Sequence, residues 1–335
     1  MATRGKTLRL LGILLLPCAS LFEDGWAQSP TLTAFYTAPV ASMAPMWIAK
    51  EAGFFAKQGL EVKLIFIASG PAGTASLLAG ETDVGILGGF APTRAVVGGA
   101  KALVIIGQSK NRITSKIVGK TEIAGVQDLK GRRLGIDRIG SNPDMFAQVA
   151  LARFHIDTFK DLQYVQLGSI GQVIPALKAG AIDAAIAGAP HDLFALRLGF
   201  KEIIDIGAMK IPFAATVLVS ARETVNRKQP ELMKFMRAYT QAMHYFLTNA
   251  EGAAGIVAKY TKVEDREINA YAIDAEAKAM EKTLQVDPKG IELILGLIAK
   301  TVPQAAAAKA EDFYDPRFFT ELRDSGFLKK LWGEN

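Results

Sequence analysis

The sequence is poor in the residues on which metal and redox chemistry depend, because it contains one cysteine and three histidines among 335 residues. A structural zinc site usually needs four cysteine or histidine ligands, so few such sites could be built. A G-x-G-x-x-G fingerprint and a G-x-S-x-G elbow are both missing, which argues against a dinucleotide site and against an α/β-hydrolase. We therefore expect no metal, no cofactor and no catalytic residues.

Long apolar runs and clustered charges are also scarce. A membrane-spanning helix needs about 20 apolar residues, and the apolar stretch Leu10–Phe22 is shorter and is interrupted by Pro17. The formal net charge is +6, but the basic residues are scattered or paired, as at Arg132 and Arg133. A nucleic-acid-binding protein would gather them in a stripe or patch. We expect no nucleic-acid partner.

The N-terminal residues have the three parts of a secretory signal peptide. Basic residues precede the apolar stretch, and Gly25 and Ala27 are small residues suited to cleavage before Gln28. The prediction is a signal peptide over residues 1–27 and a periplasmic protein. A lipid anchor at Cys18 is not expected, because Pro17 stands where a small residue is needed. A frayed N-terminal helix is the alternative interpretation of this stretch.

One segment of the sequence recurs after a hundred residues. "LLAGETDVGILGG" (Leu77–Gly89) and "LKAGAIDAAIAGA" (Leu177–Ala189) share two glycines, an aspartate and several apolar positions around them. Each reads as a helix end, a glycine turn and a strand, within a longer alternation of strands and helices. That alternation predicts two α/β units with mainly parallel sheets. Amphipathic helices are expected from Glu264 onward.

Six loops that follow predicted strands are rich in Gly, Ala, Ser and Pro. In open parallel sheets, ligands bind at the carboxyl ends of the strands, and small residues allow a ligand to approach the backbone. Turns between strands and helices also use small residues for structural reasons, which is the alternative interpretation. The candidate ligand-binding residues on these loops are Thr37, Pro39, Ser42, Met43, Ser69, Gly70, Gly88, Gly89, Phe90, Arg138, Ser141, Asn142, Ser169, Gly188, Ala189 and His191.

The one arginine in these loops suggests the charge of the ligand. Arg138 lies close to Ser141 and Asn142, the expected start of a helix whose free N–H groups favour an anionic group. A small ligand with one anionic head is therefore expected, with Met43, Met46, Trp47 and Phe90 lining an apolar part. Arg138 could instead be a solvated residue that pairs with Asp137.

The stretch "PMWIAKEAGFFAKQGLEV" (Pro45–Val62) resembles the hallmark of solute-binding proteins that serve ABC importers of aliphatic sulfonates, taurine, nitrate and thiamine pyrimidine precursors. "LLAGETDVGI", "DLKGRRLGI" and "ALKAGAIDAAI" are similar to later motifs of that family, and the likeness extends over Leu32–Asn249. The resemblance implies a type II periplasmic binding fold, with two α/β lobes that enclose a ligand, and an inner-membrane permease as partner.

The resemblance also implies how the chain is divided. Crossings between the lobes are expected near Gly119–Gly125 and Ala208–Phe213, in a protein that acts as a monomer. An enzyme branch of the family makes the thiamine pyrimidine with a cysteine cluster and a reactive histidine, and the absence of cysteine after Cys18 disfavours it. A secreted ligand-sensing domain is a further alternative. The expected division is a signal peptide (1–27), lobe I (28–122 and 210–262), lobe II (123–209) and C-terminal helices (263–335).

Overall fold

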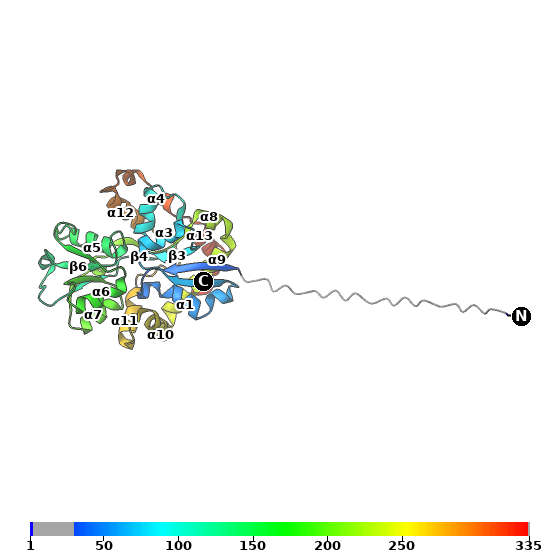
Figure 1. The fold of residues 1–335 in the computed structure, drawn as a ribbon, viewed down its shortest axis with the longest axis horizontal. Helices are drawn as coiled ribbons and strands as arrows, with labels where there is room; N and C mark the ends of the chain where they lie inside the picture. Colours follow the sequence, from blue (N-terminus) through cyan, green and yellow to red (C-terminus); the bar gives the residue numbers. More distant parts are fainter. Residues whose placement is uncertain (3–29, 334–335) are drawn as a thin grey trace.

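The computed structural model describes residues 1–2 and 30–333. Residues 3–27 of the predicted signal peptide, its cleavage site and Cys18 lie outside the described residues. In the described part, no helix combines the length and apolar character that a membrane crossing requires. Figure 1 shows two lobes side by side, lobe I in blue and cyan and lobe II in green, each built around one sheet.

Lobe I contains a five-stranded mixed sheet in the order β2-β1-β3-β10-β4. β1 pairs in parallel with β2 and β3, whereas β10 runs antiparallel to β3 and β4. All four residues of β3 are buried, because helices cover both faces of the sheet. The strands are Thr31–Tyr36 (β1), Glu61–Phe66 (β2), Val84–Leu87 (β3), Leu103–Arg112 (β4) and Pro212–Ala221 (β10). The helices that precede β5 are Ala44–Glu51 (α1), Phe54–Lys57 (α2), Gly70–Leu78 (α3) and Phe90–Val97 (α4).

Lobe II repeats this arrangement in the order β7-β6-β8-β5-β9. β6 pairs in parallel with β7 and β8, and β5 runs antiparallel to β8 and β9. The expected pair of α/β lobes with mainly parallel sheets is therefore confirmed. The strands are Lys116–Gly119 (β5), Arg133–Ile136 (β6), Gln163–Gln166 (β7), Ala184–Ala187 (β8) and Lys201–Asp205 (β9). The helices are Asn142–Ala152 (α5), Val173–Lys178 (α6) and His191–Arg197 (α7).

The chain passes between the lobes at two places, and the first differs from expectation. β4 belongs to the first sheet and β5 to the second, so the crossing lies at residues 113–115 rather than at Gly119–Gly125. Residues 116–122, which were expected in lobe I, therefore begin lobe II. A strand of four residues is too short for its side-chain pattern to reveal which sheet it joins. The second crossing lies between the end of β9 and the start of β10, at residues 206–211.

The C-terminal helices pack mainly on lobe I. α9 lies against α1 and α2, α12 against β10 and α4, and α13 against β4. α11 is the exception, because it also reaches lobe II, where Tyr271 donates a hydrogen bond to Asp192 and Glu267 pairs with Arg197. The helices after β10 are Arg222–Arg227 (α8), Gln229–Thr248 (α9), Ala250–Thr261 (α10), Arg266–Ala277 (α11), Pro288–Ala299 (α12), Arg317–Asp324 (α13) and Phe327–Trp332 (α14).

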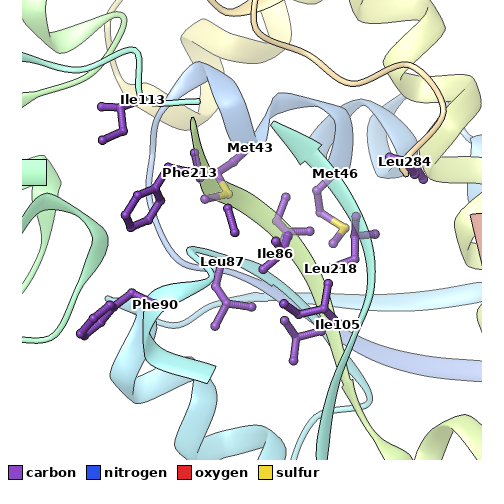
Figure 2. Close-up of a cluster of buried hydrophobic side chains, with 14 of the residues drawn as sticks. Met43, Met46, Ile86, Leu87, Phe90, Ile105, Ile113, Phe213, Leu218 and Leu284 are labelled. Atoms are coloured by element: carbon purple, nitrogen blue, oxygen red, sulfur yellow. The ribbon is translucent and has the colours of Figure 1, made fainter. Parts of the chain in front are cut away.

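Apolar side chains from these elements fill the interior of lobe I. Figure 2 shows Ile86 and Leu87 of β3 close to Phe213 and Leu218 of β10, with side chains from α1, α4 and β4 around them. Met46, Trp47 and Phe90, which were expected to line an apolar part of the ligand site, instead belong to the buried cluster. Phe90 is 2% exposed. The cluster fixes the position of β3 and β10 and therefore of the loops that follow them.

The two copies of the recurring segment form the same structure. Gly80 and Gly180 end their helices with φ values of 70° and 72°, a left-handed conformation that glycine adopts easily. The aspartate that follows each turn accepts a backbone N–H from the neighbouring strand. Asp83 binds Thr33 in lobe I, and Asp183 binds Arg133 in lobe II. Each aspartate thus holds a pair of parallel strands in register.

Asp83 also accepts a hydrogen bond from the Lys228 ammonium. Asp183 makes the stronger contact of the two, because two charged groups donate to it, the guanidinium of Arg133 and the ammonium of Lys120. Since hydrogen bonds to charged groups contribute about 1.5–3 kcal/mol, Asp183→Ala should lower the free energy of unfolding by about 2 kcal/mol. Chemical denaturation measures the difference.

The pH dependence of this loss has a definite sign. The hydrogen bond from Arg133 lowers the pKa of Asp183 in the folded protein. The stabilisation that ionised Asp183 provides is therefore present above the pKa of about 3.9 that an aspartate has in the unfolded chain. It is lost as the pH falls through the lower pKa of Asp183 in the folded protein. The control is Asp274→Ala, which removes an exposed pair with Lys278 and should cost less than about 1 kcal/mol. Equal losses in both variants would contradict the role given to Asp183.

Candidate functional site

A cavity of about 80 Å³ lies between the two lobes. Several water molecules would fit a space of this size, and so would a small solute. Lobe I contributes the loops after β1, β2 and β3, and lobe II contributes the loops after β6, β7 and β8. The lining residues are Thr37, Ala38, Val40, Ser42, Met43, Ser69, Gly70, Gly88, Lys110, Ser115, Asp137, Asn142, Pro143, Phe146, Ile170, Ile186, Gly188, Ala215 and Glu276.

Half of the sixteen candidate residues line this cavity. These are Thr37, Ser42, Met43, Ser69, Gly70, Gly88, Asn142 and Gly188. They come from the carboxyl ends of strands in both lobes, as expected for an open parallel sheet. The loops rich in small residues therefore identified the cleft, although not every residue within it.

Arg138 does not lie where a cavity ligand could reach it easily, because it is exposed and is not a lining residue. Its neighbour Asp137 lines the cavity instead and is 5% exposed. Successive side chains at the end of a strand alternate between its two sides, which places the acid inside and the arginine outside. The residue chosen to bind an anion is thus on the solvent side.

The other candidates that do not line the cavity have structural contacts. Ser141 caps α5 and donates a hydrogen bond to Asp137. Ser169 accepts the N–H of Gly171, and the N–H of Gly89 binds the carbonyl of Ala214. Phe90 is a core residue. The remaining three, Pro39, Ala189 and His191, take part in contacts between the lobes.

Among the described residues, three hydrogen bonds join the two sheets' loops directly across the cleft, in addition to the contacts of α11 with lobe II. The N–H of Ala41 donates to the carbonyl of Ala189 at 2.9 Å. The Nε2 atom of His191 lies 2.9 Å from the carbonyl oxygen of Pro39, so this nitrogen carries the proton. The structure is therefore that of a closed cleft.

The third contact comes from Asn142 on α5 of lobe II. Its Nδ2 donates to the carbonyl of Ala215 on β10 at 2.8 Å. The amide lies so close to Gly88 that a Cβ atom there would overlap it. Gly88 is thus required for the approach of Asn142 to lobe I.

Burial keeps His191 neutral in this arrangement. The side chain is 6% exposed, and burial lowers its pKa below the ordinary value. His155 is exposed, and the ring of His244 packs against Trp332. None of the three histidines is among the residues that line the cavity. Within the described residues, no group of three or more potential ligands is arranged to hold a metal.

An ion pair that sequence reasoning missed closes one side of the cavity. Lys110 of β4 and Glu276 of α11 are joined at 2.9 Å, and both are almost fully buried. Thr114 lies between them, because its hydroxyl contacts the Lys110 ammonium at 2.9 Å and donates to Glu276 at 2.8 Å. Lys110 stands in the polar second half of β4, where its neighbours give no sign that it is buried. The sequence also did not indicate that α11 would supply the acid.

Two buried polar atoms of lining residues have no hydrogen-bond partner: Ser69 Oγ and Asn142 Oδ1. Ser69 precedes α3 with a φ of 76° and a ψ of 152°, a conformation that costs a non-glycine residue about 1–3 kcal/mol. Leaving a buried acceptor unpaired costs a similar amount. Strain and unsatisfied atoms of this kind are typical of a site that awaits a ligand.

Comparison with known proteins supports a binding role for this fold. Over 247 residues the chain is 25% identical to a Brucella abortus protein named "Putative binding protein", covering 72% of this chain and 75% of that protein. A solved structure from Bordetella bronchiseptica has a TM-score of 0.77 and 19% identity, over 89% of this chain and 98% of that one.

The alkanesulfonate-binding protein SsuA of Xanthomonas axonopodis pv. citri, bound to MOPS, has a TM-score of 0.70 and 18% identity. That match covers 85% of this chain and 96% of SsuA. Other proteins of the same fold are described as binding components of ABC-type import systems. The expected type II periplasmic binding fold is confirmed by these likenesses. The model of one family, described as NMT1/THI5 like, matches residues 40–253, and the chain belongs to that family.

Proposed function

We propose that this protein is the exported, non-catalytic solute-binding component of an ABC importer. It encloses one small solute in the cavity between its lobes and delivers it to an inner-membrane permease. The observation that carries the proposal is the cavity itself, which both lobes line and in which buried polar atoms of Ser69 and Asn142 lack partners. One chain supplies the whole cavity, so the protein is proposed to act as a monomer.

The chemistry of the cavity supports binding rather than catalysis. An enzyme of the family's other branch would need a reactive histidine near its ligand, but His191 is buried against Pro39. A bond between the His191 ring and a carbonyl is suited to holding two lobes together. The anionic solute expected from the sequence has less support, because Arg138 is exposed and Lys110 is paired with Glu276.

Solute binding should stabilise the protein. The test is a thermal-shift screen of protein purified from the cell envelope and dialysed, against amines, sulfonates, carboxylates, nitrate and pyrimidines. A ligand at 100 times its dissociation constant adds about 2.7 kcal/mol of stability, which is several degrees in melting temperature for a protein of this size. If no compound class raises the melting temperature, the proposed function is wrong.

Export should leave a shortened chain. Mass spectrometry of the protein from the envelope fraction is expected to find an N-terminus at or near Gln28, as the basic start and apolar stretch predict. A full-length chain that begins at Met1 and remains in the cytoplasmic fraction would contradict export.

The approach of Asn142 to Gly88 provides a test of closure. Gly88→Ala adds a methyl group where the Asn142 amide now lies, which should break the bond to Ala215 and hold the lobes apart. Affinity for the solute found in the screen should fall at least tenfold, or about 1.4 kcal/mol. Calorimetry measures the change.

The matched control is Gly296→Ala on α12, where an added Cβ meets no heavy atom within 4 Å. This variant should bind like the unmodified protein. Unchanged affinity in Gly88→Ala would show that the contact between Asn142 and lobe I is not part of the bound state.

A further inference from the structure

Three ionisable side chains line the cavity: Lys110, Asp137 and Glu276. With the ordinary charges of these groups, the cavity carries one positive and two negative charges. Because an unbalanced charge in a closed cavity costs free energy, the charge of the solute should offset this surplus. The distribution of the three charges therefore indicates which solutes fit.

The positive charge, on Lys110, is already paired with a carboxylate of the chain. Lys110 Nζ lies 2.9 Å from Glu276 Oε2, and Thr114 bonds to both partners. An anionic solute would have to compete with Glu276 for the ammonium, and a buried acid left without its partner is costly. The pair is thus a balanced unit rather than an anion-binding group.

The amino end of α5, which could attract an anion, is occupied by acids of the chain itself. Asp144 is fully buried and accepts the N–H of Gly140 at 2.8 Å. Asp137 accepts the Ser141 hydroxyl at the same end of the helix. These two carboxylates take the place that an anion would have in the positive field of the helix. Arg138, the nearest cation in sequence, is exposed.

Asp137 remains as the unbalanced charge. It is 5% exposed, and no salt bridge of the described chain includes it. A carboxylate can accept about four hydrogen bonds. The Ser141 hydroxyl and the backbone N–H groups of Asp137 and Arg138 donate to this one, which leaves capacity for a donor from the solute. Burial raises the pKa of Asp137 to about 6, which leaves the carboxyl mostly ionised at neutral pH.

An independent observation also indicates a hydrogen-bond donor on the solute. Because the acceptor at Ala215 identifies the donating nitrogen of Asn142, the other atom of this amide must be oxygen. This Oδ1 atom is buried and has no partner. An oxygen of this kind can only accept a hydrogen bond. A sulfonate or nitrate has no N–H or O–H to offer it.

We propose that the solute carries an ammonium group that binds the Asp137 carboxylate, and that Asp137 is the residue that selects it. The inference rests on the proposed function and specifies the solute class of the same cavity. The rest of the solute would be small and apolar, since Val40, Phe146 and Ile170 form much of the remaining wall. An ammonium brings the charges of the closed cavity into balance, whereas an oxyanion adds a second unbalanced negative charge.

The test compares ligands of matched shape and opposite charge. Propylamine is paired with propanesulfonate, and benzylamine with benzoate, and calorimetry on dialysed protein from the envelope measures their dissociation constants. The amine of at least one pair should bind, and should do so at least tenfold more tightly than its anion. Tighter binding of the anions, or absence of amine binding, would overturn the proposal.

Variants of the acid decide whether Asp137 is the selecting group. Asp137→Asn keeps the shape of the side chain and an oxygen that can accept the Ser141 hydroxyl. Because it removes the negative charge, it should weaken amine binding at least tenfold. Asp274→Asn makes the same chemical change at an exposed site outside the cavity and should leave binding unchanged. Equal amine affinity in both variants would contradict the assignment.

The outcomes separate this proposal from the function on which it rests. If an anion binds and Gly88→Ala weakens it, the cavity takes up a solute but the ammonium assignment is wrong. If no compound in the broad screen stabilises the protein, the solute-binding function fails as well. The melting temperature of Asp137→Asn without ligand confirms that a loss of binding does not reflect unfolding.

Discussion

Closure of the cleft depends on hydrogen bonds between groups that cannot reach each other unless the two lobes meet. Across the cleft these bonds connect Ala41 to Ala189, His191 to Pro39 and Asn142 to Ala215, and they supplement the contacts of α11 with lobe II. Each contributes about 1 kcal/mol net, so together they are comparable to the differential binding energy of a small solute. An interface of this strength can open without a solute and close with one, because a ligand shifts such an equilibrium by its preference for the closed state.

The same strand architecture builds both walls of the cavity. In each lobe a glycine turn and an aspartate fix the start of a strand, at Gly80 and Asp83 or at Gly180 and Asp183. The carboxyl end of that strand then presents a loop of small residues to the cleft. α11 adds what neither lobe supplies, because its Glu276 pairs with Lys110 inside the cavity. The C-terminal helices are therefore part of the site as well as of its support.

The sequence was informative wherever a local pattern of residues determines the structure. Alternating strands and helices, the repeated glycine turns and the loops of small residues predicted both lobes and eight of the nineteen residues that line the cavity. Local pattern could not place β5, because Lys116–Gly119 is four residues long and its sheet is decided by pairing with β8 and β9. The error moved the first crossing and the boundary between the lobes.

The errors within the site have a different cause. The choice between Asp137 and Arg138 depends on which of two adjacent side chains faces inward, and loop composition does not determine this orientation. The pair of Lys110 and Glu276 joins residues 166 positions apart, and its geometry depends on how α11 packs between the lobes. Phe90 follows a strand at the cleft, yet it is buried in the apolar cluster and is not among the residues that line the cavity. Such features are set by tertiary packing.

Small-angle X-ray scattering, with and without a saturating solute, tests the central claim most directly. If the two lobes close on a solute through the contacts described above, the radius of gyration should decrease on binding and the maximum dimension should shorten. A radius that stays unchanged when the solute occupies its site would contradict a closing cleft and would favour a rigid body with a preformed cavity.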